Sequence, residues 1–432
     1  MKLRHLTCLL LTAAALAACT KKSPPNSVSP TSNAVSGSLP LGYAHRSPDG
    51  VASYTVVGLN HIPNWQNQSF SGSLSAFQKG CPKLQNKPAW ANVCRIAMQT
   101  HNDNQSAKSF FEQNFTAWQV RHNGSESGTV TGYYEPVLHG DKYATPTARF
   151  PIYGVPNDMV SVSLPNHLRG SKGMVRITQT GQNAGKIDAN GAFSANLAQF
   201  PIGERSSTIK GRFVGNQFVP YYTRHDINGG ALNGRAPILG YANDPVELFF
   251  MHVQGSGRLR TPNGEFIRLG FADKNEYPYV SIGKYMANRG YLPLAQTSMQ
   301  GIKSWISQNP QYLAEVLGQN PSYVFFRQLD GNSTDGPIGA LGVPLSGEYS
   351  GAVDKQYITL GAPIFVSTTH PDTRQALQRL IMAQDTGSAI KGAVRVDYFW
   401  GYGDTAGATA GKMKNAGQVW QLLPHGVMPN QY

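Results

Sequence analysis

Hydrophobic and polar residues follow two different patterns along this chain, and the change comes near residue 125. Before that point, segments such as SFSGSLSAFQKGC and NQSAKSFFEQNFTAWQV place bulky residues three and four positions apart, with Ser or Asn available as caps. We therefore expect helices within residues 42–125. After Gly124, short β-branched or aromatic runs are separated by Gly, Pro and Asn, which predicts strands joined by turns.

The strand pattern is interrupted once and then resumes. Residues 281–318 again show helical spacing, whereas the segments on both sides read as strands. Many short strands at close spacing are typical of barrels or sandwiches, so we expect a mainly β protein with some helices, organised as two β domains. The predicted strand segments are GTVTGYYEPVL, GRFVGNQFVPYYTR, VELFFMHVQGSGRLR, SYVFFRQL, ITLGAPIFVSTT and AVRVDYFWGYG.

Composition excludes several other classes of protein. Only 14% of the 432 residues are charged, 10% are aromatic, and Gly (46) and Pro (28) are frequent. Low charge and frequent Gly and Pro argue against a coiled coil or a long helical repeat, and the aromatic content argues against wholesale disorder. The length suits two or three domains.

The first residues are typical of an export signal. Lys2 and Arg4 precede a short apolar core, which ends in Leu-Ala-Ala followed by Cys19. This ending resembles the bacterial lipoprotein signal, in which residues 1–18 are removed and Cys19 is lipidated. The alternative is a membrane-spanning anchor, but the apolar stretch is shorter than the roughly 18 residues that a span needs.

The lipoprotein interpretation also predicts a location. Thr20 follows the cysteine where an Asp would favour the inner membrane, so we expect a lipid anchor in the outer membrane, on its periplasmic face. Residues 19–41 are rich in Ser, Pro and Asn and poor in bulky apolar groups, which predicts a flexible tether.

The cysteines are consistent with export. Removal of Cys8 with the signal and lipidation of Cys19 leave only Cys81 and Cys94. In an oxidising compartment two such thiols are expected to form a disulfide, the alternative being two buried free thiols. Two cysteines are too few for the usual structural zinc site.

The net charge indicates which kinds of molecule the protein could bind. The formal charge of +13 falls to about +11 when Lys2 and Arg4 are removed with the signal. Export argues against nucleic acid, which leaves the acidic polymers of a bacterial envelope: lipid head groups and peptidoglycan. A basic surface speeds encounter with either of them.

The segment LIMAQDTGSAIKGAVRVDYFWGYGD (380–404) carries the strongest chemical signal. Asp397 lies among apolar and aromatic residues of a predicted strand, and burial of a carboxylate in such a place raises its pKa. A carboxyl group that stays protonated near neutral pH is suited to general acid catalysis. The alternative is a carboxylate at a strand edge, held by Lys391 or Arg395.

Residues 385–388 read Asp-Thr-Gly-Ser, which is also the sequence of an aspartic-protease loop. Such proteases need two of these loops, because two carboxylates share one proton. The chain contains no second Asp-Thr-Gly or Asp-Ser-Gly, so a protease would require a dimer of an unusually long chain.

Three further stretches combine tyrosines or polar groups with glycine turns, which suits sugar binding by ring stacking and by hydrogen bonds to hydroxyls. The alternative for the tyrosines is barrel residues with hydroxyls at the surface. The histidines show no metal-binding spacing, and the glycines at 255 and 257 lack the third glycine of a dinucleotide site, so we expect no metal and no cofactor. The candidate residues are Tyr133, Tyr134, Glu135, Tyr221, Tyr222, Gln254 and Ser256.

Taken together, these segments resemble the membrane-bound lytic murein transglycosylase A family. The resemblance extends from about Gly132 to Trp420 and rests on the ordered combination of motifs. These are GYYEP (132–136), MHVQGSGRL (251–259), NPSYVFF (320–326), AQDTGSAIKG (383–392) and VDYFWGYG (396–403).

The resemblance implies a fold. A double-psi β-barrel domain would be formed by residues 42–140 together with 315–432. A second β-barrel domain would be inserted at 141–314, with the substrate groove between the two.

The resemblance also implies an activity, the non-hydrolytic cleavage of the β-1,4 bond between N-acetylmuramic acid and N-acetylglucosamine in peptidoglycan, which leaves 1,6-anhydromuropeptides. By position in the motifs, Asp397 would be the catalytic acid and base, with Asp385 as a supporting carboxylate. Thr386 and Lys391 would join the tyrosines, Gln254 and Ser256 in substrate binding.

Two alternatives from other classes remain. One is a hydrolytic glycosidase with Asp397 as acid and Asp385 or Asp404 as base. The other is a non-catalytic lipoprotein that binds peptidoglycan or scaffolds other cell-wall enzymes.

Overall fold

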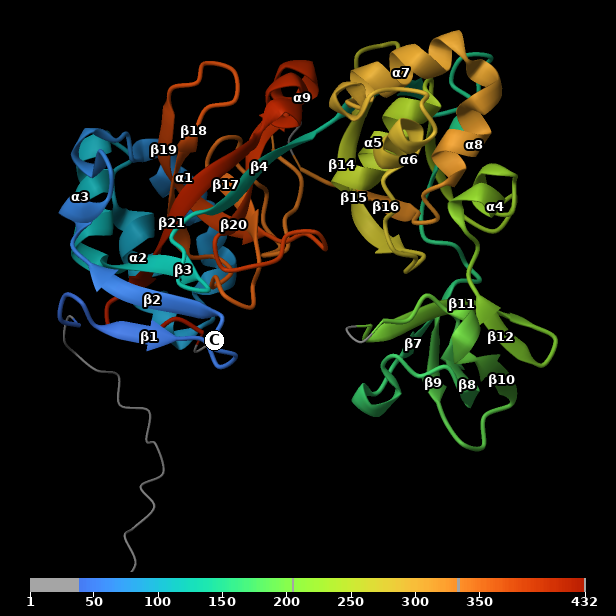
Figure 1. Cartoon of the computed structure of the whole chain (residues 1–432), viewed down its shortest axis with the longest axis horizontal. Helices are drawn as coiled ribbons and strands as arrows, with labels where there is room; N and C mark the ends of the chain where they lie inside the picture. The colour runs from blue at the N-terminus through green and yellow to red at the C-terminus, as the bar shows by residue number, and fades with distance from the viewer. Residues whose placement is uncertain (1–38, 204–205, 332–334, 431–432) are drawn as a thin grey trace, which may run out of the picture. The chain divides into compact units, whose positions relative to one another are not determined.

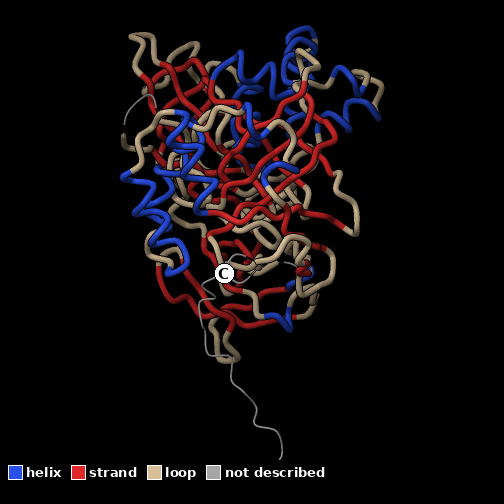
Figure 2. Tube along the Cα trace, turned by 90° about the vertical axis from the view of Figure 1, so that its left-hand side faces the viewer, coloured by secondary structure: helices blue, strands red, loops and turns tan. Residues whose placement is uncertain are grey.

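The computed structural model of the chain describes residues 39–203, 206–331 and 335–430 (Figure 1). The predicted signal, Cys19 and residues 20–38 of the predicted tether lie outside the described residues. Strands, drawn in red in Figure 2, make up most of the regular structure, with helices in blue between them. The predicted class, mainly β with some helices, is confirmed.

The expected N-terminal helices are present as α1 (Ser71–Leu84), α2 (Pro88–Gln99) and α3 (Asn104–Asn114). Asp103 caps α3 by accepting a hydrogen bond from the Ser106 N–H, and a proline begins α2. Cys81 of α1 and Cys94 of α2 are joined by a disulfide. Aromatic side chains hold the three helices together, among them Phe77, Trp90, Phe110, Phe111 and Phe115.

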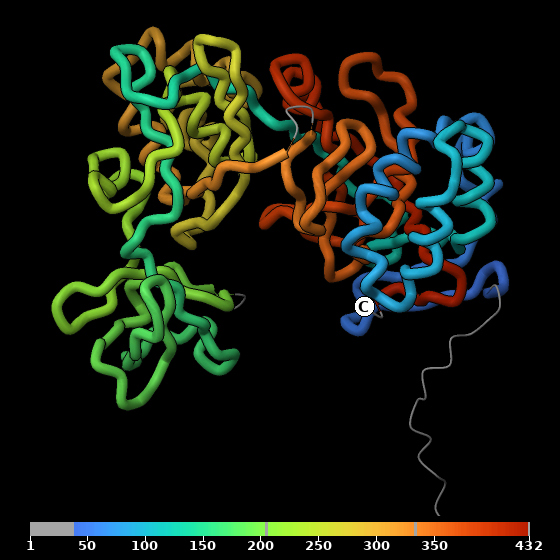
Figure 3. Tube along the Cα trace, turned by 180° about the vertical axis from the view of Figure 1, so that it is seen from behind, coloured from blue at the N-terminus to red at the C-terminus, as the bar shows by residue number. Residues whose placement is uncertain are grey.

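The largest sheet has nine strands in the order β1-β2-β3-β21-β18-β19-β17-β20-β4. An additional pairing of β21 with β4 closes its last six strands into a ring, which is a barrel. Figure 3 shows its C-terminal strands beside the N-terminal helices, segments that are far apart in sequence. The strands are β1 (Ala44–Arg46), β2 (Ala52–Val57), β3 (Phe115–His122), β4 (Gly128–Glu135), β17 (Ser350–Val353), β18 (Pro363–Thr369), β19 (Ala376–Asp385), β20 (Arg395–Tyr402) and β21 (Lys414–Pro424), and α9 (Gly403–Lys412) packs on β4 and β20.

A second sheet of six strands has the order β16-β15-β14-β5-β13-β6. It includes β5 (Val137–Asp141) and β16 (Val324–Gln328), so it begins before residue 141 and ends after residue 314, the boundaries expected for the insert. Within this sheet β5 is a central strand that pairs with β13 and β14, and β16 is an edge strand that pairs with β15. The other strands are β6 (Phe150–Tyr153), β13 (Ile238–Ala242), β14 (Ser256–Arg260) and β15 (Phe266–Lys274); the helices of this region are α4 (Arg224–Asn228), α5 (Pro245–Gln254), α6 (Ile282–Asn288), α7 (Met299–Gln308) and α8 (Leu313–Gly318).

A small closed barrel is formed by residues 160–220, and its strand order is β10-β12-β11-β7-β9-β8. Its interior is filled by apolar side chains such as Val162, Ile177 and Phe218, so it is a packed core. Its strands are β7 (Val160–Ser163), β8 (Met174–Gly181), β9 (Ala184–Ile187), β10 (Phe193–Asn196), β11 (Thr208–Val214) and β12 (Gln217–Pro220).

One predicted strand is wrong. The run VELFFMHVQ forms helix α5 and not a strand. Asp244 accepts hydrogen bonds from the backbone N–H groups of Val246 and Glu247, Pro245 takes the first helical position, and Gly255 ends the helix in the left-handed conformation at φ 79°. The β-branched and aromatic composition favoured a strand, but these end signals and burial between neighbouring elements decide for a helix.

Among the residues that the structure describes, none of the helices combines the length and the apolar character that a membrane crossing needs.

Candidate active site

Three barrel strands bring the two predicted aspartates together. Asp385 ends β19 and Asp397 lies within β20, and Ala352 of the intervening strand β17 is the register partner of both. On the other side of β20, parallel strand β4 places Thr131 opposite Asp397 and Tyr133 opposite Phe399. Residues opposite each other on neighbouring strands present their side chains on the same face. The barrel therefore gathers Thr131, Tyr133, Asp385 and Asp397.

Asp397 is half-buried. The Thr131 hydroxyl donates to its Oδ1 over 2.5 Å, and Arg395 Nη2 donates to Thr131 Oγ1 over 2.9 Å. Burial raises the pKa of Asp397, and the negative charge of Asp385 raises it further, whereas the Thr131 hydrogen bond and the Arg395 charge lower it. The net effect is a raised pKa, which favours the protonated form.

Asp385 lies in a different arrangement of donors. The Tyr133 hydroxyl donates to Oδ2 and the Ala340 backbone N–H donates to Oδ1, each over 3.0 Å. Burial raises the pKa of Asp385, and these donors together with the Thr386 N–H reduce that rise without reversing it. Burial and the two nearby carboxylates raise the pKa of Tyr133 well above its usual range, so Tyr133 remains a hydroxyl donor.

Position 132 needs a glycine because neighbouring segments of the chain pass very close to it. A Cβ at this position would lie 2.7 Å from Nε1 of Trp400 and 3.0 Å from the Ala410 backbone. Since the glycine lets β4 pass directly beneath α9 and Trp400, it allows Thr131 and Tyr133 on either side of it to reach the aspartates.

Tyr134 and Gln254 are also brought together. The Tyr134 N–H donates to Gln254 Oε1 over 3.3 Å, which links β4 to the end of α5. Both side chains are half-buried, as are Ser256, at the start of β14, and Thr386, while Lys391 is exposed. Because Oε1 of Gln254 is used as an acceptor, its amide N–H groups remain as donors.

Glu135 is not available to a ligand. Its side chain is fully buried and its Oε2 accepts from Arg258 Nε over 2.8 Å. Burial raises the pKa of Glu135 and the Arg258 cation opposes the rise. This buried ion pair joins β4 to β14, so the contribution of Glu135 is structural, in contrast to the predicted sugar contact.

The tyrosines at 221 and 222 have partners other than the two predicted aspartates. Tyr221 is buried and its hydroxyl donates to Asp158 over 2.7 Å, while Arg212 stacks over the Tyr222 ring at 4.3 Å. The burial of Tyr221 leaves it no surface for a sugar. Both residues follow β12, and the Tyr221 ring also packs edge-on against Phe325 of β16, in the neighbouring sheet, at 6.3 Å between ring centroids.

Sequence reasoning missed Thr131 and Ala340. Thr131 had a usable signal, because it precedes Tyr133 by two positions and alternate residues of a strand share a face. Ala340 contributes only its backbone N–H, which no side-chain pattern can reveal. Arg395 was considered only as a direct partner of Asp397, whereas its Nη2 donates to Thr131.

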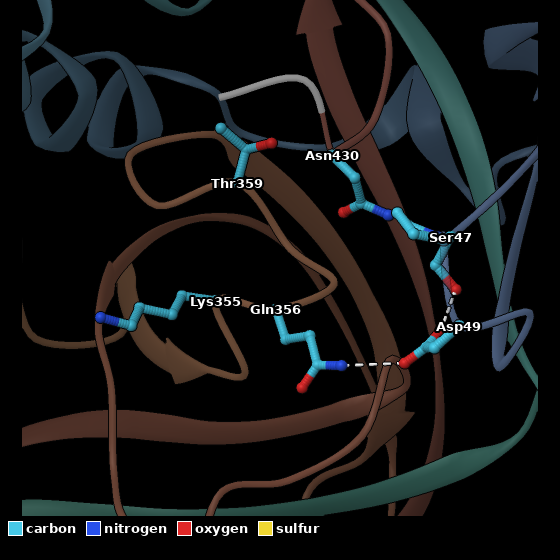
Figure 4. Close-up of a pocket in the computed structure, with 7 residues that line it drawn as sticks. Ser47, Asp49, Lys355, Gln356, Thr359 and Asn430 are labelled. Atoms are coloured by element: carbon cyan, nitrogen blue, oxygen red, sulfur yellow. Dashed lines mark hydrogen bonds between the residues drawn. The ribbon is translucent and has the colours of Figure 1, made fainter. Parts of the chain in front are cut away.

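Two cavities lie elsewhere in the described structure. One of about 230 Å³ is shown in Figure 4, where the Gln356 amide and the Ser47 hydroxyl point to Asp49 and the Lys355 amine points away. The other, of about 450 Å³, is lined by Arg224 and His252 among mostly apolar residues. Neither is lined by Asp385 or Asp397.

Comparison with known families finds two matching domain models. Residues 129–327 match the MltA specific insert domain, and residues 349–423 match the 3D domain. The two matches follow each other along the chain, and the 3D match includes both aspartates.

Solved structures and curated proteins agree with these matches. The crystal structure of MltA from Neisseria gonorrhoeae is 63% identical, covers 91% of this chain and 96% of its own, and superposes with a TM-score of 0.85. A structure of Escherichia coli MltA with bound chitohexaose is 25% identical, with coverage of 86% and 94% and a TM-score of 0.58. Membrane-bound lytic murein transglycosylase A of Vibrio cholerae is 36% identical over 210 residues, which is 46% of this chain and 55% of that protein. The chain thus matches about half the length of its curated relatives.

Proposed function

Because the chain belongs to the MltA family, we propose that it is a peptidoglycan lytic transglycosylase whose catalytic acid and base is Asp397. One observation supports Asp397 as the catalytic residue. Asp397 is a half-buried carboxyl group with a raised pKa, and its contacts leave one oxygen without a hydrogen bond among the described residues. A protonated oxygen in that position is what the first step of glycosidic cleavage requires.

The proposed reaction uses one carboxyl group twice. Asp397 first gives its proton to the glycosidic oxygen as the bond between that oxygen and C1 of N-acetylmuramic acid breaks. The C6 hydroxyl of the same sugar then bonds to C1, and its proton passes to the Asp397 carboxylate. The products are a free 4-hydroxyl and a 1,6-anhydro ring, and no water is consumed. The nucleophile belongs to the substrate, so its effective concentration is very high.

Asp385 has a supporting part in this proposal. Both of its oxygens accept hydrogen bonds, from Tyr133 and from Ala340, an arrangement that suits an ionised carboxylate. Its negative charge raises the pKa of Asp397. It therefore helps to keep Asp397 protonated and stabilises positive charge that develops on the sugar ring.

Substrate binding is proposed for the accessible residues near this site. The free amide donors of Gln254, the rings of Tyr133 and Tyr134, and the polar groups of Ser256, Thr386 and Lys391 suit a sugar polymer with acetamido and carboxylate groups. The Escherichia coli relative with bound chitohexaose supports a glycan ligand.

An envelope location is part of the proposal. Curated relatives are named membrane-bound, and the predicted signal ends at Cys19. We place the protein in the outer membrane, lipidated at Cys19 and facing the periplasm, in cell-wall turnover and remodelling alongside other cell-wall enzymes. Labelling with an alkyne fatty acid should mark the wild-type protein and not Cys19→Ala; equal labelling of both would contradict the anchor.

Product analysis tests the activity. Purified protein is incubated with sacculi, and the released muropeptides are analysed by mass spectrometry before and after borohydride reduction. We expect anhydro ends that borohydride does not reduce. Reducing ends would indicate the hydrolytic alternative, and unchanged sacculi would indicate a binding or scaffolding protein. Asp397→Asn is the control, whose release should be about a thousandfold lower.

A further inference from the structure

The hydrogen bonds next to Asp397 have a preferred direction. An arginine side chain carries donors and no acceptor, so Thr131 Oγ1 must accept from Arg395 Nη2, 2.9 Å away. The threonine hydroxyl has a single proton, and Asp397 Oδ1 is the acceptor it reaches among the described residues, so donation to Oδ1 is the arrangement that satisfies it. The chain of donors therefore runs from Arg395 through Thr131 to Asp397.

This direction distinguishes the two oxygens of Asp397. Oδ1 accepts the Thr131 proton. A second proton bound to Oδ1 would face that hydroxyl proton, which is unfavourable. Oδ2 has no hydrogen bond among the described residues. When Asp397 is neutral, its proton is thus left on Oδ2.

From this geometry we propose that Arg395 is a positioning residue, which acts through Thr131 to place the acidic proton of Asp397 on Oδ2, the oxygen that would meet the glycosidic bond. The inference rests on the proposed function, because it concerns the same acid. It adds a residue that does not touch the substrate and assigns the reacting atom.

The guanidinium of Arg395 is itself held in place. Its Nη1 donates to the carbonyl of Val396 over 2.6 Å and lies 3.4 Å from the carbonyl of Thr129, on the parallel neighbouring strand. These contacts fix one arm of the planar fork across β20 and β4, which directs the other arm at Thr131. A lysine would keep the charge but has no second arm, so the two residues are not interchangeable here.

The charges that face Asp397 set the expected pH behaviour. They are the Arg395 cation on its own strand, Asp385 on β19, and Tyr133 on β4, which stays neutral. Arg395 lowers the pKa of Asp397, so its removal raises that pKa. A general acid is lost as pH rises through its pKa, hence the basic limb of activity should move to higher pH without Arg395.

The test is a double-mutant cycle of Arg395→Met and Thr131→Val, measured as kcat and KM on purified glycan strands below the basic limb. Each single variant should lower kcat about tenfold, the size expected for one hydrogen bond to a charged group, with little change in KM. The kcat of the double variant should be no lower than that of Thr131→Val alone, because Arg395 is linked to Asp397 Oδ1 by hydrogen bonds only through Thr131. Thr131→Ser should restore activity.

Control variants distinguish the positioning role of Arg395 from an effect of its charge and from a loss of folding. Lys414 is an exposed cation on β21 and the register partner of Thr131, so Lys414→Met removes a nearby charge without touching the hydrogen bonds and should leave kcat unchanged. Arg395→Lys keeps the charge and should still show lowered kcat. Melting temperatures identify any variant that is unfolded, and Thr131→Ser and Arg395→Lys preserve most of the packing.

The possible outcomes are distinct. A full tenfold loss from Arg395→Met in the Thr131→Val background would overturn the route through Thr131. Wild-type kcat in Arg395→Lys would show that charge alone suffices and would also overturn it. An inactive wild-type protein would contradict the proposed function itself, whereas an active one with additive variants contradicts only the positioning role.

Discussion

Carboxyl groups at two places along strand β4 have contrasting surroundings. At its end, Glu135 is fully buried and bonded directly to Arg258, whose side chain is 1% exposed. In its middle, Thr131 and Tyr133 contact Asp397 and Asp385, and neither aspartate has an ion pair among the described residues. Both regions remove carboxyl groups from water, but only the first supplies a cation in contact.

The difference explains which acid can do chemistry. Burial raises the pKa of both Glu135 and Asp397, so it is their contacts that distinguish them. The direct bond to Arg258 occupies Oε2 of Glu135 and ties this residue to the fold, and Tyr402 adds to the pair by stacking at 4.0 Å from Arg258. At Asp397 the nearest cation acts through the Thr131 hydroxyl, and Oδ2 has no hydrogen bond among the described residues. Strand β4 therefore carries a structural acid, Glu135, and contacts a reactive acid, Asp397 of β20. The two acids differ in whether an arginine bonds the carboxyl group directly.

The largest expected effect comes from removing the reactive acid. Asp397→Asn should lower the release of anhydromuropeptides by about a thousandfold, since proton transfer to and from the sugar is lost. Thermal unfolding should show a folded protein of equal or greater stability, because a buried acid without an ion pair is replaced by a neutral amide. Retention of a tenth of wild-type release would remove Asp397 from its role.

Breaking the structural pair should affect stability instead. Arg258→Met leaves Glu135 buried and unpaired, which should cost about 3 to 5 kcal/mol of unfolding free energy in urea titrations. The double variant Glu135→Gln with Arg258→Met should recover part of that loss, since no charge is left buried. If Arg258→Met and Glu135→Gln proved simply additive, the pair would not be coupled as the contact indicates.

Asp385 offers a smaller and more specific effect. Asp385→Asn should reduce kcat about tenfold and move the basic limb of activity to lower pH. The sign follows because the Asp385 charge raises the pKa of Asp397, so its loss lowers that pKa and the acid deprotonates earlier. A pH profile of initial rates decides the point, and a limb that moves upward would reverse the assigned electrostatic role.

The smallest effect is the pH dependence of stability. The folded pKa of Asp397 is raised above its ordinary value of 3.8, so its contribution to stability is complete below that value and is lost as pH rises through the folded pKa. Wild type should therefore lose stability relative to Asp397→Asn on going from about pH 4 to neutral pH. Parallel unfolding curves at several pH values measure this difference, and a constant difference would contradict the raised pKa.

Local sequence was sufficient for several features of the fold. Helical spacing with capping residues predicted the region of α1 to α3, and short aromatic runs predicted most barrel strands. The prediction from local sequence failed at residues 246–254, where strand-like composition gave helix α5. Asp244, Pro245 and Gly255 define the helix ends, and about half of the segment is buried. Composition alone does not distinguish a buried helix from a buried strand.

For the active site, the sequence alone showed that Asp397 lies among apolar residues and that Asp385 belongs to the same motif segment. Tertiary structure decided what each carboxyl group contacts. Thr131 reaches Asp397 across 266 positions of sequence and Arg258 reaches Glu135 across 123, so the pairing exists only once the sheets have formed. The pKa of a buried acid depends on donors and charges within a few ångströms, and those neighbours are set by strand register rather than by residues adjacent in the chain.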